Sequence, residues 1–144
     1  MLESEYNIAA DVWSVTSYKE LYTDALETDR WNLLHPTENR KDSYIQQCTG
    51  NAGGVFVAAS DYLKALPLSI AKWLPGRLVA LGTDGFGRSD ARADLRNYFE
   101  VDARFITLGA LHGLALEGQI DNSLLAAAIE KMNIDPEKIS PLFV

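Results

Sequence analysis

A glycine-rich stretch in the second half of the chain has the residue types for binding chemistry: Leu81-Gly82-Thr83-Asp84-Gly85-Phe86-Gly87-Arg88-Ser89-Asp90. A turn of this kind between a strand and a helix can cradle a phosphate group. The spacing here is G-x-x-G-x-G, the reverse of the dinucleotide fingerprint, and no Lys-Ser or Lys-Thr pair follows it. The carboxylate of Asp84 would also repel a phosphate. We therefore expect the turn to pack against protein.

The step Thr83-Asp84-Gly85 is similar to the Gly-Asp-Gly opening of a thiamine diphosphate site. Such a site needs a magnesium-ligating aspartate and asparagines that complete the oxygen shell of the metal. The region that should hold the asparagines contains no asparagine pair and reads Gly109-Ala110-Leu111-His112-Gly113. We expect no cofactor-binding or metal-binding residue in this chain.

The two histidines and the one cysteine lack the neighbours that catalysis requires. His35 precedes Pro36 at the expected end of a helix, where a positive side chain suits the helix dipole. Cys48 has no base near it in the sequence. His112 lies between Leu108 and Leu116 on one helix face, which favours a hydrogen-bonded, partly buried residue. The sequence therefore predicts no catalytic residue.

The charged residues of the turn allow two interpretations. Arg92 and Arg96 share a face of the following helix, and Arg88 lies one turn earlier. The group is either a solvated, salt-bridged surface or a docking edge for another domain or subunit. The candidate contact residues are Asp84, Gly85, Gly87, Arg88, Asp90 and Arg92.

The composition fits one globular domain of 144 residues, with 47% hydrophobic and 23% charged residues. A net charge of −7 argues against a nucleic-acid partner. No apolar run is long enough for a membrane span, and the acidic start, Met1–Glu5, does not resemble a signal peptide. The single Cys48 suits a reducing compartment. We expect a cytoplasmic location.

Apolar runs and helix signals alternate along the chain. They predict strands at residues 8–15, 55–59 and 77–81, and helices at 18–34, 91–99, 103–117 and 121–133. A further helix is expected after Ser60, broken at Pro67, and Ser89 and Asp90 are expected to cap the helix that follows the turn. The tail, 139–144, is apolar enough to lie against the body. This order predicts a three-layer α/β/α fold with a mainly parallel sheet.

Four segments together resemble one family. They are the turn with Phe99-Glu100-Val101-Asp102, the run Ala10–Tyr18, the run Gly54–Tyr62, and Asn133-Ile134-Asp135. The family is the C-terminal domain of the homodimeric pyruvate dehydrogenases, the decarboxylating component of that complex, which is transketolase C-terminal-domain-like. The resemblance covers essentially the whole chain.

The resemblance implies an enzyme that decarboxylates pyruvate and acetylates the lipoyl groups of a dihydrolipoyl acetyltransferase. Its thiamine diphosphate and magnesium lie between two larger domains of opposite subunits, and the C-terminal domain serves interdomain and dimer contacts. We therefore expect residues 1–144 to be a single domain, a C-terminal fragment without its opening strand and helix, and inactive alone. The alternative is a stand-alone protein-binding module derived from that domain. A small hydrolase ranks last, because no nucleophile, base and oxyanion set is found.

Overall fold

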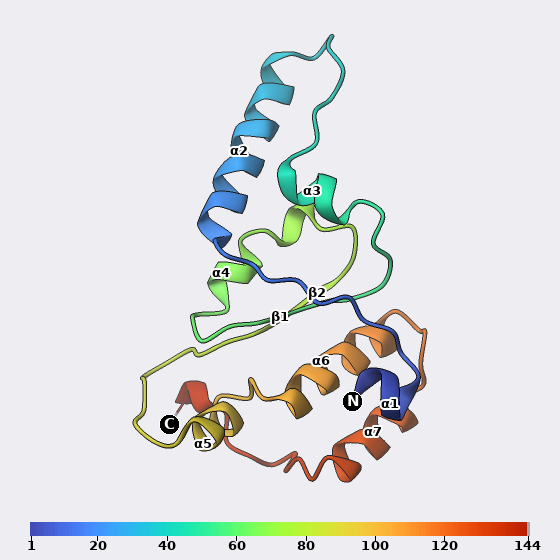
Figure 1. Cartoon of the computed structure of the whole chain (residues 1–144), viewed down its shortest axis with the longest axis vertical. Coiled ribbons are helices and arrows are strands. Elements are labelled where there is room, and N and C mark those ends of the chain that lie inside the picture. Colours follow the sequence, from blue (N-terminus) through green and yellow to red (C-terminus); the bar gives the residue numbers. More distant parts are fainter. Residues whose placement is uncertain (144) are drawn as a thin grey trace.

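The structure is a computed structural model and describes residues 1–143 (Figure 1). Helices lie on both sides of a small central sheet, with α2, α3 and α4 on one side and α5, α6 and α7 on the other. The elements in chain order are α1 (Leu2–Tyr6), α2 (Tyr18–Leu34), α3 (Tyr44–Thr49), β1 (Phe56–Ala59), α4 (Ala65–Leu68), η1 (Ala71–Trp73), β2 (Leu78–Leu81), α5 (Arg92–Tyr98), α6 (Ala103–Leu116), α7 (Asn122–Lys131) and η2 (Pro141–Phe143).

Strands β1 and β2 run parallel, with Phe56 opposite Leu78 and Ala59 opposite Leu81. Both strands fall within the predicted runs, and the mainly parallel α/β arrangement is confirmed. Helix α6 packs closely on the sheet through its glycines. A Cβ built on Gly109 would lie 3.3 Å from Val79 Cγ1, and one on Gly113 would collide with Val55.

Two apolar clusters form the core. The first joins α2, α3 and η1 through Ala25, Ile45, Ile70 and Trp73. The second joins α6 and α7 with the N-terminal helix, and its residues are Leu111, Ala128 and Met132, flanked by Leu2, Tyr6, Ile8, Leu108, Ile120, Leu125 and Ile134. The sheet lies between the two clusters (Figure 1).

The predicted strand at residues 8–15 is wrong. This segment forms no strand, and Val12 is 96% exposed. The reason is where its ends are anchored. Ile8 packs into the second cluster, whereas Tyr18 packs into the first. The chain between them is stretched from one cluster to the other, and in the described part of the chain the sheet consists of β1 and β2 alone.

Local signals set most helix boundaries. Helix α2 has its predicted bounds, and Ser17 Oγ accepts a hydrogen bond from the backbone N–H of Glu20 at 3.2 Å. Asp102 caps α6 by accepting from the backbone N–H groups of Arg104 and Phe105, at 2.9 and 3.1 Å. The helix predicted after Ser60 forms in two short pieces, α4 and η1, although Pro67 lies inside α4 and the break comes after it. Ser60 does not cap it, because Ser60 Oγ accepts a hydrogen bond from the N–H of Tyr62 in a turn.

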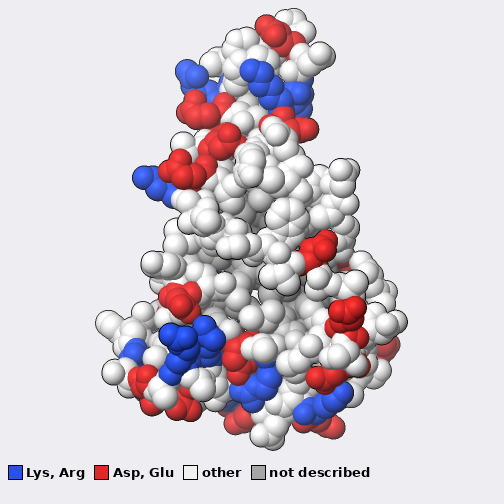
Figure 2. Space-filling model, in the orientation of Figure 1, with Lys and Arg blue, Asp and Glu red and all other residues white. Residues whose placement is uncertain are grey.

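Charged side chains gather at the two ends of the molecule in the view of Figure 2. A band with few charges crosses between them, at the level of α4 and the sheet. Within residues 1–143, no helix has both the length and the apolar character needed to cross a membrane.

Candidate interdomain contact site

The glycine turn begins where β2 ends, and backbone bonds tie it to the loop that follows β1. The N–H of Ser60 donates to the carbonyl of Leu81 at 3.1 Å, and the N–H of Thr83 donates to the carbonyl of Tyr62 at 2.9 Å. These bonds hold the two loops together at the carboxyl end of the parallel strands, the edge where ligands and partners usually bind in such sheets.

Asp84 strengthens the same junction. Its Oδ1 accepts a hydrogen bond from the backbone N–H of Lys64 at 3.0 Å, and its Oδ2 lies 3.7 Å from Lys64 Nζ. A carboxylate that accepts from a backbone N–H and lies beside a cation of the same chain is already paired within that chain. Asp84, one of the predicted contact residues, therefore holds the start of the turn in place through contacts inside the chain.

Gly85 brings the turn against the C-terminal tail. Its φ of 86° is in the left-handed region, which favours glycine. A Cβ at Gly85 would lie 3.3 Å from the carbonyl oxygen of Pro141 and 3.7 Å from Leu142 Cα. The tail thus lies against the body beside the turn, although its apolar side chains remain exposed. Val144 lies outside the described residues.

Arg88 and the tail meet on α5. The guanidinium carbon of Arg88 lies 4.4 Å from the centre of the Tyr98 ring. Lys138 Nζ donates to the carbonyls of Asn97 and Tyr98, at 2.7 and 2.9 Å, and so binds the last turn of the same helix. Tyr98 is therefore the common support for the turn and the tail.

The remaining predicted contact residues are exposed. Helix α5 begins at Arg92 with Ala91 as its N-cap and no side-chain cap, so the predicted capping by Ser89 and Asp90 is wrong. Asp90 Oδ1 accepts from the N–H of Ala91 at 2.8 Å, which leaves the helix itself uncapped. A Cβ at Gly87 would meet nothing within 4 Å.

Apolar side chains that the sequence interpretation overlooked surround this junction. Phe86, between two glycines of the turn, is 87% exposed, and Phe143 in the tail is 80% exposed. We call the exposed apolar residues of the loop, the turn and the tail the apolar rim; they are Tyr62, Leu63, Phe86, Ile139, Leu142 and Phe143. The signal was present in the sequence as a large apolar residue in a glycine turn, where solvation alone would favour a polar one.

The histidines do not take part in this site. His35 Nδ1 donates to the carbonyl of Trp31 at 2.8 Å, and the two rings stack with centroids 4.4 Å apart, so the predicted helix-end role is confirmed. The predicted burial of His112 is wrong, because its side chain is exposed on α6. Cys48 is half-buried on α3.

The donors in the described part of the chain do not fit a magnesium diphosphate group. No three His, Cys, Asp or Glu side chains of residues 1–143 are grouped as a metal site requires. The carboxylate of Asp84, the residue most similar in position to a metal ligand, is held by Lys64 instead.

Comparison with known proteins identifies the family. The family model described as the transketolase-like TK C-terminal domain matches residues 1–102. That match takes in β1, β2, the glycine turn and α5. The chain belongs to the transketolase-like C-terminal domain family. The match thus covers every element from α1 to α5, including the parallel strands and the turn at their carboxyl ends.

Curated relatives extend the similarity beyond the family model. The chain is 48% identical over 143 residues to the pyruvate dehydrogenase E1 component of Pseudomonas aeruginosa, covering 99% of this chain. It is 44% identical over 142 residues to that of Escherichia coli K12 and 41% identical over 141 residues to that of Mycobacterium tuberculosis, in each case over 98% of this chain. The chain spans about 16% of the length of the relatives it matches.

Proposed function

We propose that this chain is the C-terminal domain of a thiamine-diphosphate-dependent pyruvate dehydrogenase and that it serves assembly, not chemistry. The decarboxylation of pyruvate then belongs to thiamine diphosphate and magnesium held outside this chain. The proposal is supported by 41–48% identity, across nearly the whole chain, to proteins named pyruvate dehydrogenase E1 component. In this reading the enzyme is a cytoplasmic homodimer that acetylates the lipoyl groups of a dihydrolipoyl acetyltransferase.

The observation that carries the assembly role is the apolar rim beside the glycine turn. Phe86 and Phe143 are the kind of large side chain that interfaces bury, and each is at least 80% exposed here. The backbone beneath Phe86 is well supported, because Asp84 binds Lys64 and Arg88 lies on Tyr98. An interface that docks on a preorganised loop loses little conformational entropy on binding.

The charged residues of the turn then have a supporting part. Asp84 and Arg88 shape the turn through contacts within the chain, while Arg92 stays exposed beside it. Gly85 lets the turn approach the tail, and Gly87 leaves open space around the loop. We place the contact surface on Phe86 and the tail, with Asp90 and Arg92 at its polar edge.

Replacing Phe86 tests this proposal in the natural polypeptide that carries these residues. Phe86→Ala removes an exposed anchor, so we expect the dimer dissociation constant to rise about tenfold or more, which corresponds to about 1.4 kcal/mol. Sedimentation velocity measures the dimer, and the rate of pyruvate decarboxylation should fall on dilution and recover at high protein concentration.

Leu116→Ala is the matched control, because Leu116 is also exposed but lies at the end of α6, outside the apolar rim. We expect it to leave dimerisation and decarboxylation unchanged. Equal behaviour of the two variants would refute the contact role of the turn. A polypeptide that dimerises normally but never decarboxylates pyruvate would refute the enzyme assignment separately.

A further inference from the structure

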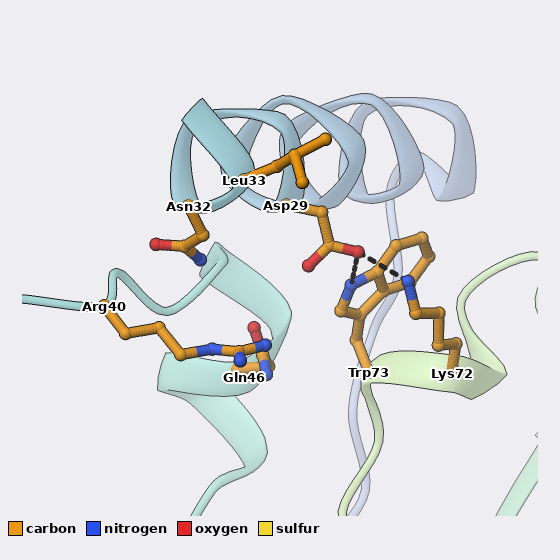
Figure 3. A pocket seen from close by; sticks show the side chains of 7 residues that line it. All are labelled: Asp29, Asn32, Leu33, Arg40, Gln46, Lys72 and Trp73. Carbon is orange, nitrogen blue, oxygen red and sulfur yellow. Dashed lines mark hydrogen bonds and ion pairs between the residues drawn. The ribbon is translucent and has the colours of Figure 1, made fainter. Parts of the chain in front are cut away.

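A hollow of about 420 Å³ lies between the C-terminal half of α2, the loop at residues 35–43, α3 and η1 (Figure 3). Asp29 and Leu33 come from α2, Arg40 from the loop, Gln46 from α3, and Lys72 and Trp73 from η1. None of these residues belongs to the glycine turn or to the apolar rim. The inference drawn from this hollow is therefore independent of the proposed function.

The one carboxylate that lines the hollow is already neutralised. Asp29 Oδ2 accepts hydrogen bonds from Lys72 Nζ at 2.6 Å and from the indole Nε1 of Trp73 at 3.1 Å. The hydrogen bond from Lys72 is the main reason that the pKa of Asp29 lies below its usual value, with the bond from Trp73 and the nearby charge of Arg40 acting in the same direction against partial burial. Asp29 and Lys72 thus balance each other on this wall.

Arg40 adds a second positive charge to the hollow, and this charge acts on Asp29 without forming an ion pair with it. Among residues 1–143, no ion pair or hydrogen bond engages its guanidinium group. Its backbone is nonetheless well placed, because the side chain of Asn32 holds the next residue, Lys41, by two hydrogen bonds at 2.9 and 2.8 Å. Lys41 Nζ lies 3.6 Å from the centre of the Trp31 ring, which secures the same loop.

Gln46 adds a donor beside that charge. Its Oε1 accepts from both the N–H and the Oγ of Ser43, at 3.0 and 2.8 Å, so its amide nitrogen faces away from Ser43. Figure 3 shows the amide of Gln46 beside the guanidinium of Arg40, below the Asp29 carboxylate. A guanidinium and an amide N–H side by side are suited to one carboxylate, with the guanidinium binding in bidentate fashion.

The shape of the hollow favours a protein segment over a free small molecule. It is open to solvent, whereas small-molecule sites bury most of their ligand. A second hollow of about 250 Å³ shares Gln46, Lys72 and Trp73 with it and continues toward Leu74 and Pro75. Through these shared residues the two hollows form one continuous groove. Leu33, 77% exposed, lies on α2 at the edge of the first hollow, with its side chain directed away from Arg40 (Figure 3).

We propose that this groove binds an extended segment of a partner protein, with a glutamate or aspartate carboxylate on Arg40 and Gln46. The acidic residue binds at the Arg40 end, because Asp42 lines the other half of the groove and repels a carboxylate there. Charge complementarity favours this occupant at the Arg40 end: the walls of the first hollow hold Arg40, Lys72 and Asp29, which leaves one net positive charge there, and Asp42 balances it only in the second hollow.

Titration with the blocked peptide acetyl-Ala-Leu-Glu-Leu-Ala-amide tests this proposal by NMR. We expect saturable shifts of the indole N–H of Trp73 at peptide concentrations of about a millimolar, as a single charged contact of this kind gives. The same peptide with Gln in place of Glu should bind at least tenfold more weakly. Equal binding of the two peptides, or no shift of the Trp73 signal, would overturn the proposal.

Two variants and one small anion complete the test. Arg40→Gln should weaken binding of the Glu peptide at least tenfold, whereas Arg30→Gln, the same charge change on α2 outside the hollow, should not alter it. Arg40 is exposed, so circular dichroism should show the fold unchanged. Sodium acetate that shifts Trp73 with the affinity of the Glu peptide would show a site for free anions and contradict the docking of a segment.

Discussion

Asp84 and Arg88 illustrate how a charged residue near a surface can be engaged by its own chain. The sequence placed both on a docking edge, but Asp84 binds Lys64 and Arg88 lies on Tyr98. Their partners are 20 and 10 positions away, a distance at which spacing along the chain carries no information. Phe86 shows the opposite case. Phe86 lies between two glycines of the turn and is 87% exposed, so its exposure could be predicted from the sequence.

At the scale of single residues, Asp102 should make the stability of the fold depend on pH. Burial raises the pKa of Asp102, but hydrogen bonds from Arg104 and from the backbone N–H of Phe105 outweigh it, so the pKa lies below its usual value. A lowered pKa in the folded state means that the carboxylate stabilises the fold above about pH 4, the unfolded value, and that this contribution disappears as pH falls through the folded value.

Asp102→Asn keeps the capping oxygen, Oδ1, and removes the charge together with the Oδ2 acceptor of Arg104. We expect it to lower the free energy of unfolding at pH 7 by about 0.5–1 kcal/mol, the usual size of a charge effect at a helix N-terminus. The difference from the unmodified chain should shrink below about pH 4. Urea unfolding at pH 7 and pH 3 measures it, and a difference that stays constant between these pH values would show that the charge has no such role.

At the scale of elements, the sequence predicted those whose hydrogen bonds are local. Helix α2 has its predicted bounds, and α6 begins at the predicted residue, Ala103, directly after its cap Asp102. Strands β1 and β2 were also found, because each is a short apolar run next to a turn signal. The run at 8–15 is also mostly apolar, but a strand needs a neighbour, and this segment spans two clusters instead. Pairing is a long-range property that composition does not encode.

The close packing of α6 on β1 gives a prediction at this scale. Gly113→Ala would place a Cβ into the side chain of Val55, whereas alanine at a helix interior normally gains about 1 kcal/mol over glycine. Overpacking costs about 1–3 kcal/mol, so we expect a net loss of stability. Gly87→Ala, where a Cβ meets nothing within 4 Å, is the control and should stay within about 0.5 kcal/mol.

Urea unfolding measures the free energy of unfolding of both variants. The slope of this free energy against urea concentration should be the same for both, so that a shifted midpoint reports stability alone. A Gly113→Ala protein more stable than the unmodified chain would show that α6 does not need its glycine for contact with the sheet. In that case the approach of α6 to Val55 would be looser than the structure indicates.

At the scale of the whole molecule, the chain has surfaces left over after its own core is formed. The two clusters bury few large side chains completely, while the apolar rim, the stretched segment with Val12, and Leu33 by the groove stay exposed. Large apolar patches on a folded chain mark interaction sites. This distribution suits a domain that meets other protein on several sides, and it agrees with a chain that spans about 16% of its relatives' length.

The assembly role and the location of the cofactor can be tested in one calorimetric experiment. Thiamine diphosphate with magnesium would be titrated into the 144-residue chain and, separately, into the natural polypeptide that carries it. We expect saturable binding to the natural polypeptide and no heat of binding with the 144-residue chain, folded as judged by circular dichroism. Micromolar binding to the 144-residue chain, or none to the natural polypeptide, would contradict the proposal that this domain assembles a thiamine-dependent enzyme without holding its cofactor.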